Sequence, residues 1–307
     1  MREQILSKLE ISREYECPSC KNQGLVIGTS LSAEVIHCNN CDLSFLKNSI
    51  RPNSANDNSW YADLRDCPQS WVDTFVSDMH EAYSRQLTVL ENLTKGRKIA
   101  DIGCGIGVFL SIAKEHNWEV VGVEESEHGA YFADTKFNIK YSPSLDNFPI
   151  NTFDVIRISH VLEHIPEPQD FLAKINRILK PNGILMVIVP NFEPLCSMFI
   201  NKFRGMISEK PKLTCSVYPD MHVLGFSTKS LSNIASLRKF QTINISTVSM
   251  GNKTYYPMFY DGLLTTKKIS NISAQSFFKY FLPLIINNLG NKFQKGEWIV
   301  GYFQKVE

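Results

Sequence analysis

The chain has 307 residues, with 32 Lys and Arg against 31 Asp and Glu, so its formal net charge is only +1. This balance argues against a global positive field for nucleic acid or an anionic membrane, although local basic patches are not excluded. The first ten residues lack the apolar core of a signal peptide, and no apolar run is long enough to span a bilayer. We therefore expect a cytoplasmic protein, long enough for one α/β core and a small accessory module.

Four of the eight cysteines form two C-x-x-C pairs near the start of the chain. The pairs are Cys17-Pro-Ser-Cys20 and Cys38-Asn-Asn-Cys41, and strand-like residues separate them. In a cytosolic chain this spacing indicates a tetrahedral zinc site, and the metal replaces the core that so short a module cannot build. We expect one structural Zn²⁺ on these four thiolates. The alternative is a degenerate ribbon that keeps its cysteines but binds metal poorly.

A helix is predicted next, because apolar residues recur at helical spacing between residues 71 and 93. The polar, turn-rich stretch at 53–59 is the predicted linker between the cysteine module and this helix. The helix would then lead into the main domain.

A glycine-rich turn follows, between a predicted strand ending at 99–102 and a predicted helix at 107–115. Gly103, Gly105 and Gly107 alternate, which lets the backbone approach a ligand without Cβ atoms in the way. A dinucleotide-binding turn would instead follow G-x-G-x-x-G, and its last position is not glycine here.

Downstream segments read as an alternating α/β chain. A second apolar strand at 119–124 ends in Glu124, where an acid in a nucleoside-binding fold can accept both ribose hydroxyls. Further strands are predicted at 153–159 and 184–189, with a helix at 170–179 between them. Two more strands are predicted at 240–248 and 297–303.

Three phrases carry a family resemblance: the D-x-G-x-G-x-G turn that starts at Asp101, "FDVI…HVLEHIPEP" and "ILKPNGILMVIVPN". Over about residues 97–250 the chain resembles the class I S-adenosylmethionine (SAM) methyltransferases of the ubiquinone-biosynthesis-like branch. Its start resembles bacterial zinc-ribbon methyltransferases of polysaccharide and secondary-metabolite pathways, except that Asp42 replaces their usual glycine. The resemblance implies a Rossmann-like, doubly wound sheet of seven strands with the last strand antiparallel.

The resemblance also implies the cofactor and its contacts. Asp101 would help to hold the methionine ammonium, directly or through water, and Asp146 would accept from the adenine amino group. The expected cofactor-binding residues are Asp101, Gly103, Cys104, Gly105, Gly107, Glu124, Asp146 and Ser159.

The candidate catalytic residues are His160, Glu163, His164 and His222. The first three follow the strand at 153–159, at the edge where open α/β sheets bind ligands, and they share a face if the chain turns helical there. His222 lies in a segment that resembles "HLHFF(S/T)", an element over the substrate side in the same branch. In one interpretation His164, or else His222, is the general base toward a hydroxyl.

In the other interpretation the cluster binds a second divalent metal at the acceptor site, as the E-x-x-E-H segments of related O-methyltransferases suggest. His160 replaces the first glutamate of that pattern, which argues against magnesium, because imidazole suits zinc or iron better.

The predicted organisation has three parts. Residues 1–52 form the zinc ribbon with an N-terminal arm, residues 53–95 the linker and helical cover, and residues 96–307 the SAM-binding domain. A helical insertion at about 250–295 is aromatic and apolar, and it would be a lid, a peripheral membrane contact, a homodimer face or an extra packed helix pair. The segment 198–204 would form another piece of the lid.

The predicted function is SAM-dependent methylation of a hydroxyl on a sugar, a lipid-linked glycan or a related small molecule in polysaccharide or metabolite biosynthesis. Nucleic acid is disfavoured by the charge balance. The alternatives are an RNA methyltransferase that grips RNA with the ribbon, and a SAM-binding scaffold without catalysis.

Overall fold

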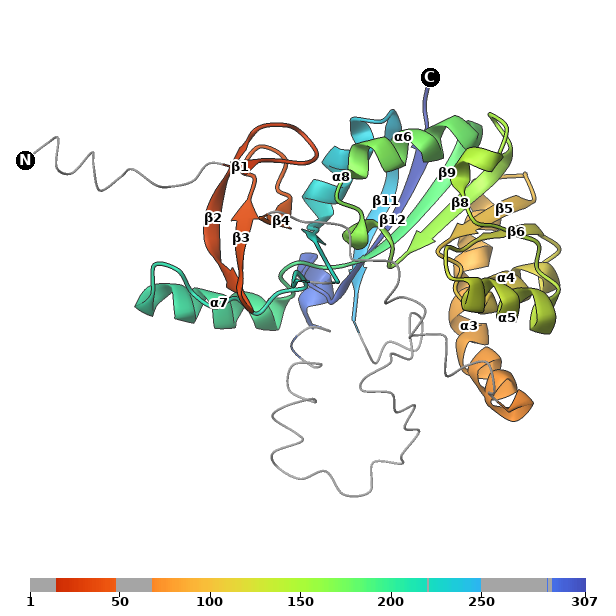
Figure 1. The fold of residues 1–307 in the computed structure, drawn as a ribbon, viewed down its shortest axis with the longest axis horizontal. Coiled ribbons are helices and arrows are strands. Elements are labelled where there is room, and N and C mark those ends of the chain that lie inside the picture. The colour runs from red at the N-terminus through yellow and green to blue at the C-terminus, as the bar shows by residue number, and fades with distance from the viewer. Residues whose placement is uncertain (1–14, 48–67, 220, 250–285, 287–288) are drawn as a thin grey trace, which may run out of the picture.

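The computed structural model describes residues 15–47, 68–219, 221–249, 286 and 289–307. Its largest element is a seven-stranded sheet in the order β11-β12-β9-β8-β5-β6-β7 (Figure 1). Its strands are β5 (Lys98–Ile102), β6 (Glu119–Val123), β7 (Tyr141–Ser142), β8 (Phe153–Ser159), β9 (Leu179–Pro190), β11 (Phe240–Val248) and β12 (Trp298–Lys305). β12 pairs antiparallel with both of its neighbours, whereas the pairs among β5 to β9 are parallel. The predicted fold, with its last strand antiparallel, is confirmed.

Helices cover both faces of this sheet, as its apolar strands require. The helices are α3 (Gln69–Leu93), α4 (Val108–Glu115), α5 (Glu127–Phe137), α6 (Pro168–Ile178), α7 (Leu195–Ile207) and α8 (Thr228–Ser236). Buried residues of α3, α4 and α5 cluster with Val155 of β8, while those of α6 and α8 cluster with its neighbour Ile156. Successive strand residues point to opposite faces, so the sheet is doubly wound. Within the described ranges no helix has both the length and the hydropathy to cross a bilayer.

The cysteine module, drawn in red in Figure 1, forms most of a second, smaller sheet. Its strands are β1 (Tyr15–Glu16), β2 (Gln23–Ser30), β3 (Ala33–His37), β4 (Ser44–Leu46) and β10 (Leu224–Gly225), in that order. β10 belongs to the main part of the chain, yet it pairs antiparallel with β4 through Leu224 opposite Phe45. The ribbon sheet is therefore completed by a strand from the predicted SAM-binding part.

Side chains reinforce this junction. The Ser19 hydroxyl accepts a hydrogen bond from Gln169 Nε2 of α6 at 2.9 Å, and the Ser227 hydroxyl at the start of α8 donates to Asp42. Buried ribbon residues such as Phe45 share one hydrophobic cluster with Phe226. The ribbon thus packs on the α6 and α8 side of the sheet. The predicted linker and most of the predicted helical insertion lie outside the described residues.

Candidate functional site

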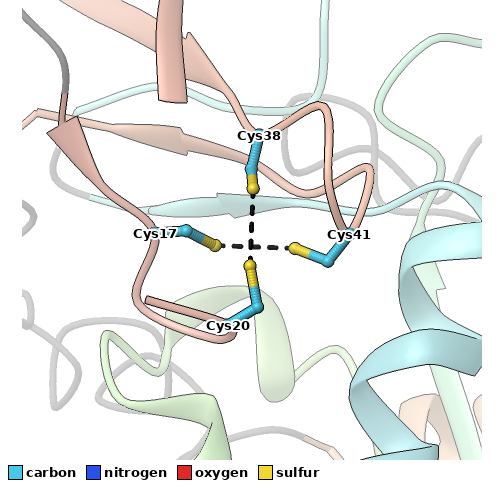
Figure 2. Close-up of side chains that lie close together, drawn as sticks. All are labelled: Cys17, Cys20, Cys38 and Cys41. Carbon is cyan, nitrogen blue, oxygen red and sulfur yellow. Dashed lines mark hydrogen bonds between the residues drawn. The ribbon is translucent and has the colours of Figure 1, made fainter. Parts of the chain in front are cut away.

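The four ribbon thiols converge on one point (Figure 2). The Sγ atoms of Cys17 and Cys41 lie 3.5 Å apart, as do those of Cys20 and Cys38, and all four lie within 4.8 Å of one another. Zinc–sulfur bonds of about 2.3 Å place the sulfurs of a tetrahedral site about 3.8 Å apart. The four cysteines therefore fit Zn²⁺. The hydrogen bond from Cys41, with backbone donors, lowers the pKa of Cys17 to about 5, and the same contact raises the pKa of Cys41.

The two knuckles repeat one backbone pattern. The residues after the second cysteines, Lys21 and Asp42, have φ values of 61° and 67°. Their amides donate to the carbonyls of the first cysteines at 3.0 and 2.8 Å. A left-handed φ favours glycine, and aspartate is among the residues that tolerate it. Asp42 replaces the family's glycine, and its carboxylate accepts from Ser227 of the main domain.

The glycine turn has a left-handed backbone at three alternate positions, a conformation that favours glycine. Gly103, Gly105 and Gly107 have φ values of 69°, 53° and 81°. A Cβ at Gly103 would lie 2.4 Å from Cγ2 of Val161, and one at Gly107 would lie 2.9 Å from Cβ of Ala133. The turn therefore lies directly against the segment that follows β8.

Glu124 lies half-buried at the end of β6 and is tied to the same turn. Its Oε2 accepts from the amide of Gly105 at 2.8 Å, and its Oε1 accepts from the amide of Ser126 at 2.9 Å. Burial raises the pKa of Glu124 against the opposing effect of these two bonds. A carboxylate oxygen can accept two hydrogen bonds, and each oxygen of Glu124 accepts one from these amides. Capacity therefore remains for two ribose hydroxyls.

Asp101 is buried and forms an ion pair with Arg157, which the sequence analysis did not single out. Nη1 of Arg157 donates to both carboxylate oxygens of Asp101, at 2.8 and 3.0 Å, and Nε of Arg157 donates to Gln86 of α3 at 3.3 Å. Burial raises the pKa of Asp101, although the Arg157 guanidinium opposes this. The sequence does hold a sign of this ion pair, because Arg157 is a charged residue within the largely apolar strand at 153–159. The expected contact between Asp101 and the methionine ammonium stays a prediction.

The other expected cofactor residues differ in position. The Cys104 thiol points into the core, since a Cβ built on Gly122 would lie 2.7 Å from its Sγ. Ser159 ends β8 and is half-buried. Asp146 is exposed and pairs with Nζ of Lys174 at 2.8 Å. The contact predicted between Asp146 and adenine stays untested.

The candidate catalytic residues come together at the end of β8. The predicted helical turn is a short 3₁₀ helix, Leu162–His164, and His160 before it has a left-handed φ of 55°. Nδ1 of His160 donates to Oε1 of Glu163 at 3.2 Å. Glu163 is only 1% exposed. Burial alone would raise the pKa of Glu163, but the hydrogen bond from His160 lowers it, as does the positive charge of each nearby imidazole when that ring is protonated.

His164 and His222 each use one ring nitrogen for a backbone carbonyl. Nδ1 of His164 donates to Met221 at 2.8 Å, and Nδ1 of His222 donates to Ser216 at 2.8 Å. These bonds fix the tautomer and leave a lone pair on each Nε2. The ring centroids lie 4.9 Å apart. Burial lowers the pKa of His222, which favours the neutral ring.

Glu163, His164 and His222 also form a donor set for a cation. One donor atom from each lies within 4.8 Å of the others. Within the described residues, Oε2 of Glu163 is buried without a hydrogen-bond partner. A carboxylate and two imidazoles suit a divalent transition metal. His160 is outside this set and instead holds Glu163.

Comparison with known proteins assigns the chain to a family. The methyltransferase-domain family matches residues 75–244, which is more than half of the chain. The glycine turn and the sheet with one antiparallel strand define a class I fold. The chain therefore belongs to the class I SAM-dependent methyltransferase family.

Among its relatives, the demethylmenaquinone methyltransferase of Staphylococcus saprophyticus is 27% identical over 121 residues, covering 36% of this chain and 52% of the relative. The ubiquinone biosynthesis O-methyltransferase of Psychrobacter arcticus is 23% identical over 141 residues, covering 42% and 54%. The chain thus spans about half the length of these curated relatives. A chain in the complex between the Haloferax volcanii Trm112 methyltransferase activator and a methyltransferase shares the fold, with a TM-score of 0.50, 16% identity and coverage of 84% and 100%.

We expect about one zinc per chain in protein expressed with sufficient metal. The double variant Cys17→Ser/Cys38→Ser should lose the zinc and have a lower melting temperature, because metal binding drives the folding of such modules. Metal analysis and thermal unfolding test this. Absence of zinc from the wild-type chain, or unchanged stability in the double variant, would contradict a structural zinc site.

We expect Gly105→Val to weaken binding of S-adenosylhomocysteine strongly, since valine cannot easily adopt the left-handed φ of this turn. Gly205→Val is the matched control, because a Cβ at Gly205 meets no atom within 4 Å. Calorimetric titration of both variants checks the expectation. Wild-type affinity in Gly105→Val would show that the turn does not bind the cofactor.

Proposed function

We propose that this chain transfers a methyl group from SAM to a hydroxyl oxygen of a small-molecule or glycan acceptor. One observation carries the proposal: Glu163, His164 and His222 converge on one point, and Val161 of the same segment packs against Gly103 of the glycine turn. Groups that can remove a proton therefore lie next to the predicted cofactor site. The name of the ubiquinone biosynthesis O-methyltransferase among the relatives supports oxygen as the methylated atom.

The two histidines are suited to remove the acceptor's proton. SAM, when bound, supplies a methyl group attached to a positively charged sulfur. Nε2 of His164 or His222 accepts the hydroxyl proton, because Nδ1 of each ring is committed to a carbonyl. We favour His164 as the base, because Nε2 of His222 already lies 4.0 Å from Oε1 of Glu163. Glu163 would then stabilise the imidazolium that forms.

The same three side chains would hold a divalent cation at the acceptor site. The carboxylate oxygen of Glu163 that lacks a partner within the described residues supports this version. A cation there would lower the pKa of a bound hydroxyl and orient it. The base and the cation are two versions of one proposal, and both act on the acceptor oxygen.

The proposed class of acceptor rests on the net charge of the chain and on its resemblance to zinc-ribbon methyltransferases. The chain carries no overall basic excess, which disfavours RNA. The resemblance to zinc-ribbon methyltransferases of polysaccharide and metabolite pathways favours a sugar, a lipid-linked glycan or a related metabolite in the cytoplasm. We further propose that residues 1–52, 53–95 and 96–307 act as ribbon, helical cover and SAM-binding domain.

We expect His164→Ala to lower methyl transfer by roughly a hundredfold or more, because it removes the proton acceptor. The protein is incubated with isotope-labelled SAM as methyl donor and with each of three acceptors, a dihydroxybenzoate, a nucleotide-linked hexose and a lipid-linked glycan. The methylated product is detected by mass spectrometry. Affinity for S-adenosylhomocysteine should not change. His80→Ala is the control, since His80 pairs with Glu115 on the surface.

A chelator distinguishes the two versions. If a cation is required, chelation should abolish transfer and an added divalent ion should restore it, with the zinc content of the ribbon measured in parallel. Near-normal, chelator-resistant transfer in both His164→Ala and His222→Ala would overturn both versions.

A further inference from the structure

The helix α7 presents a large apolar face to solvent. The most exposed side chains are Phe199 at 58%, Phe203 at 66%, Met206 at 79% and Ile207 at 74%. The helix follows the end of β9 and projects from the body beneath the ribbon (Figure 1). At about 100° per residue, these positions lie on one side of the helix.

The opposite side of α7, which faces the protein, is polar. Ser197 and Asn201 are each only 8% exposed. Asn201 donates to Glu193 and to the carbonyl of Thr214, both at 3.0 Å, and accepts from the amide of Thr214 at 2.8 Å. An ordinary surface helix buries its apolar stripe and exposes its polar side. α7 does the reverse, and side-chain hydrogen bonds hold it in that rotation.

Basic residues accompany the apolar face. Between residues 195 and 212 there are four cations, Lys202, Arg204, Lys210 and Lys212, and a single anion, Glu209. Lys202, Lys210 and Lys212 are exposed, and Lys210 lies 3.7 Å from Glu34 of the ribbon. Arg204 instead donates to the carbonyl of Lys212 and to Thr214 on the protein side. An apolar face flanked by cations is the arrangement of helices that lie in the plane of a membrane interface. Anionic headgroups complement these charges.

We propose that α7 binds to the surface of an anionic phospholipid bilayer. Phe199, Phe203, Met206 and Ile207 enter the boundary between headgroups and acyl chains, and the flanking lysines contact the headgroups. A second copy of the chain is a poorer occupant, because a two-fold contact through α7 would bring like charges together. The membrane contact goes beyond the proposed methyl transfer and does not depend on it, whereas its consequence for the acceptor rests on the proposed function.

The position of α7 gives this contact a consequence for the candidate site. Thr214, which anchors α7, lies two residues before Ser216, whose carbonyl accepts the hydrogen bond from His222. The membrane contact therefore connects through a short stretch of chain to the acceptor side. A bilayer at α7 would favour acceptors with a lipid part.

Sedimentation with vesicles tests the proposal on the full, zinc-loaded chain. We expect binding to phosphatidylcholine vesicles that contain phosphatidylglycerol, weaker binding to pure phosphatidylcholine, and loss of binding at high salt. The double variant Phe203→Glu/Met206→Glu should reduce the vesicle-bound fraction at least tenfold. Ile150→Glu is the matched control, since Ile150 is also 66% exposed but precedes β8, at the other end of the strands.

Other results would overturn the proposal. They include no binding of the wild-type chain to anionic vesicles, or equal binding by the double variant. A large drop in the melting temperature of the double variant without vesicles would show that the protein's own chain covers this face. A change from dimer to monomer with vesicle binding unchanged would assign the face to a second copy. Affinity for S-adenosylhomocysteine should be the same in every variant, so failure here leaves the proposed function untouched.

Discussion

The antiparallel pairing of β4 with β10 joins the ribbon to the segment of the chain that carries His222. The amide of Leu46 donates to the carbonyl of Val223 at 3.1 Å, and the amide of Val223 donates to the carbonyl of Glu163 at 2.9 Å. Val223 directly follows His222 in the chain. One buried residue therefore connects the ribbon backbone with both the glutamate and the second histidine of the cluster.

This connection explains how a small metal module can matter to a site that contains none of its side chains. The ribbon is too short to form a core of its own, and its cysteines share one hydrophobic cluster with Phe226 and Leu231. Zinc on the four thiolates would fix the loop before β4, and β4 in turn fixes β10. The glycine turn and Glu124 depend instead on β5 and β6 in the main sheet. The cluster of Glu163 and His222 and the glycine turn thus have separate supports.

Local patterns in the sequence were enough to predict the main strands of the large sheet and the cluster of four cysteines. The strands at 153–159 and 240–248 have the predicted bounds, because alternation and apolar runs are properties of neighbouring residues. β10 was not predicted, because a strand of two residues shows no alternation of apolar and polar residues and its partner strand lies far away in the chain. The pair between Asp101 and Arg157 escaped for the same reason, because which strands become neighbours decides it. The exposed face of α7 was also missed, as an apolar stripe alone does not show which way it points.

Hydrogen exchange of the Val223 amide tests the central claim, that the ribbon holds Glu163 and His222 in place. The comparison is between zinc-loaded wild-type protein and the Cys17→Ser/Cys38→Ser variant, both bound to S-adenosylhomocysteine. We expect faster exchange at residues 223–225 and around Glu163 in the variant, with protection of the amides of the glycine turn unchanged. Equal protection of Val223 in both proteins would contradict it.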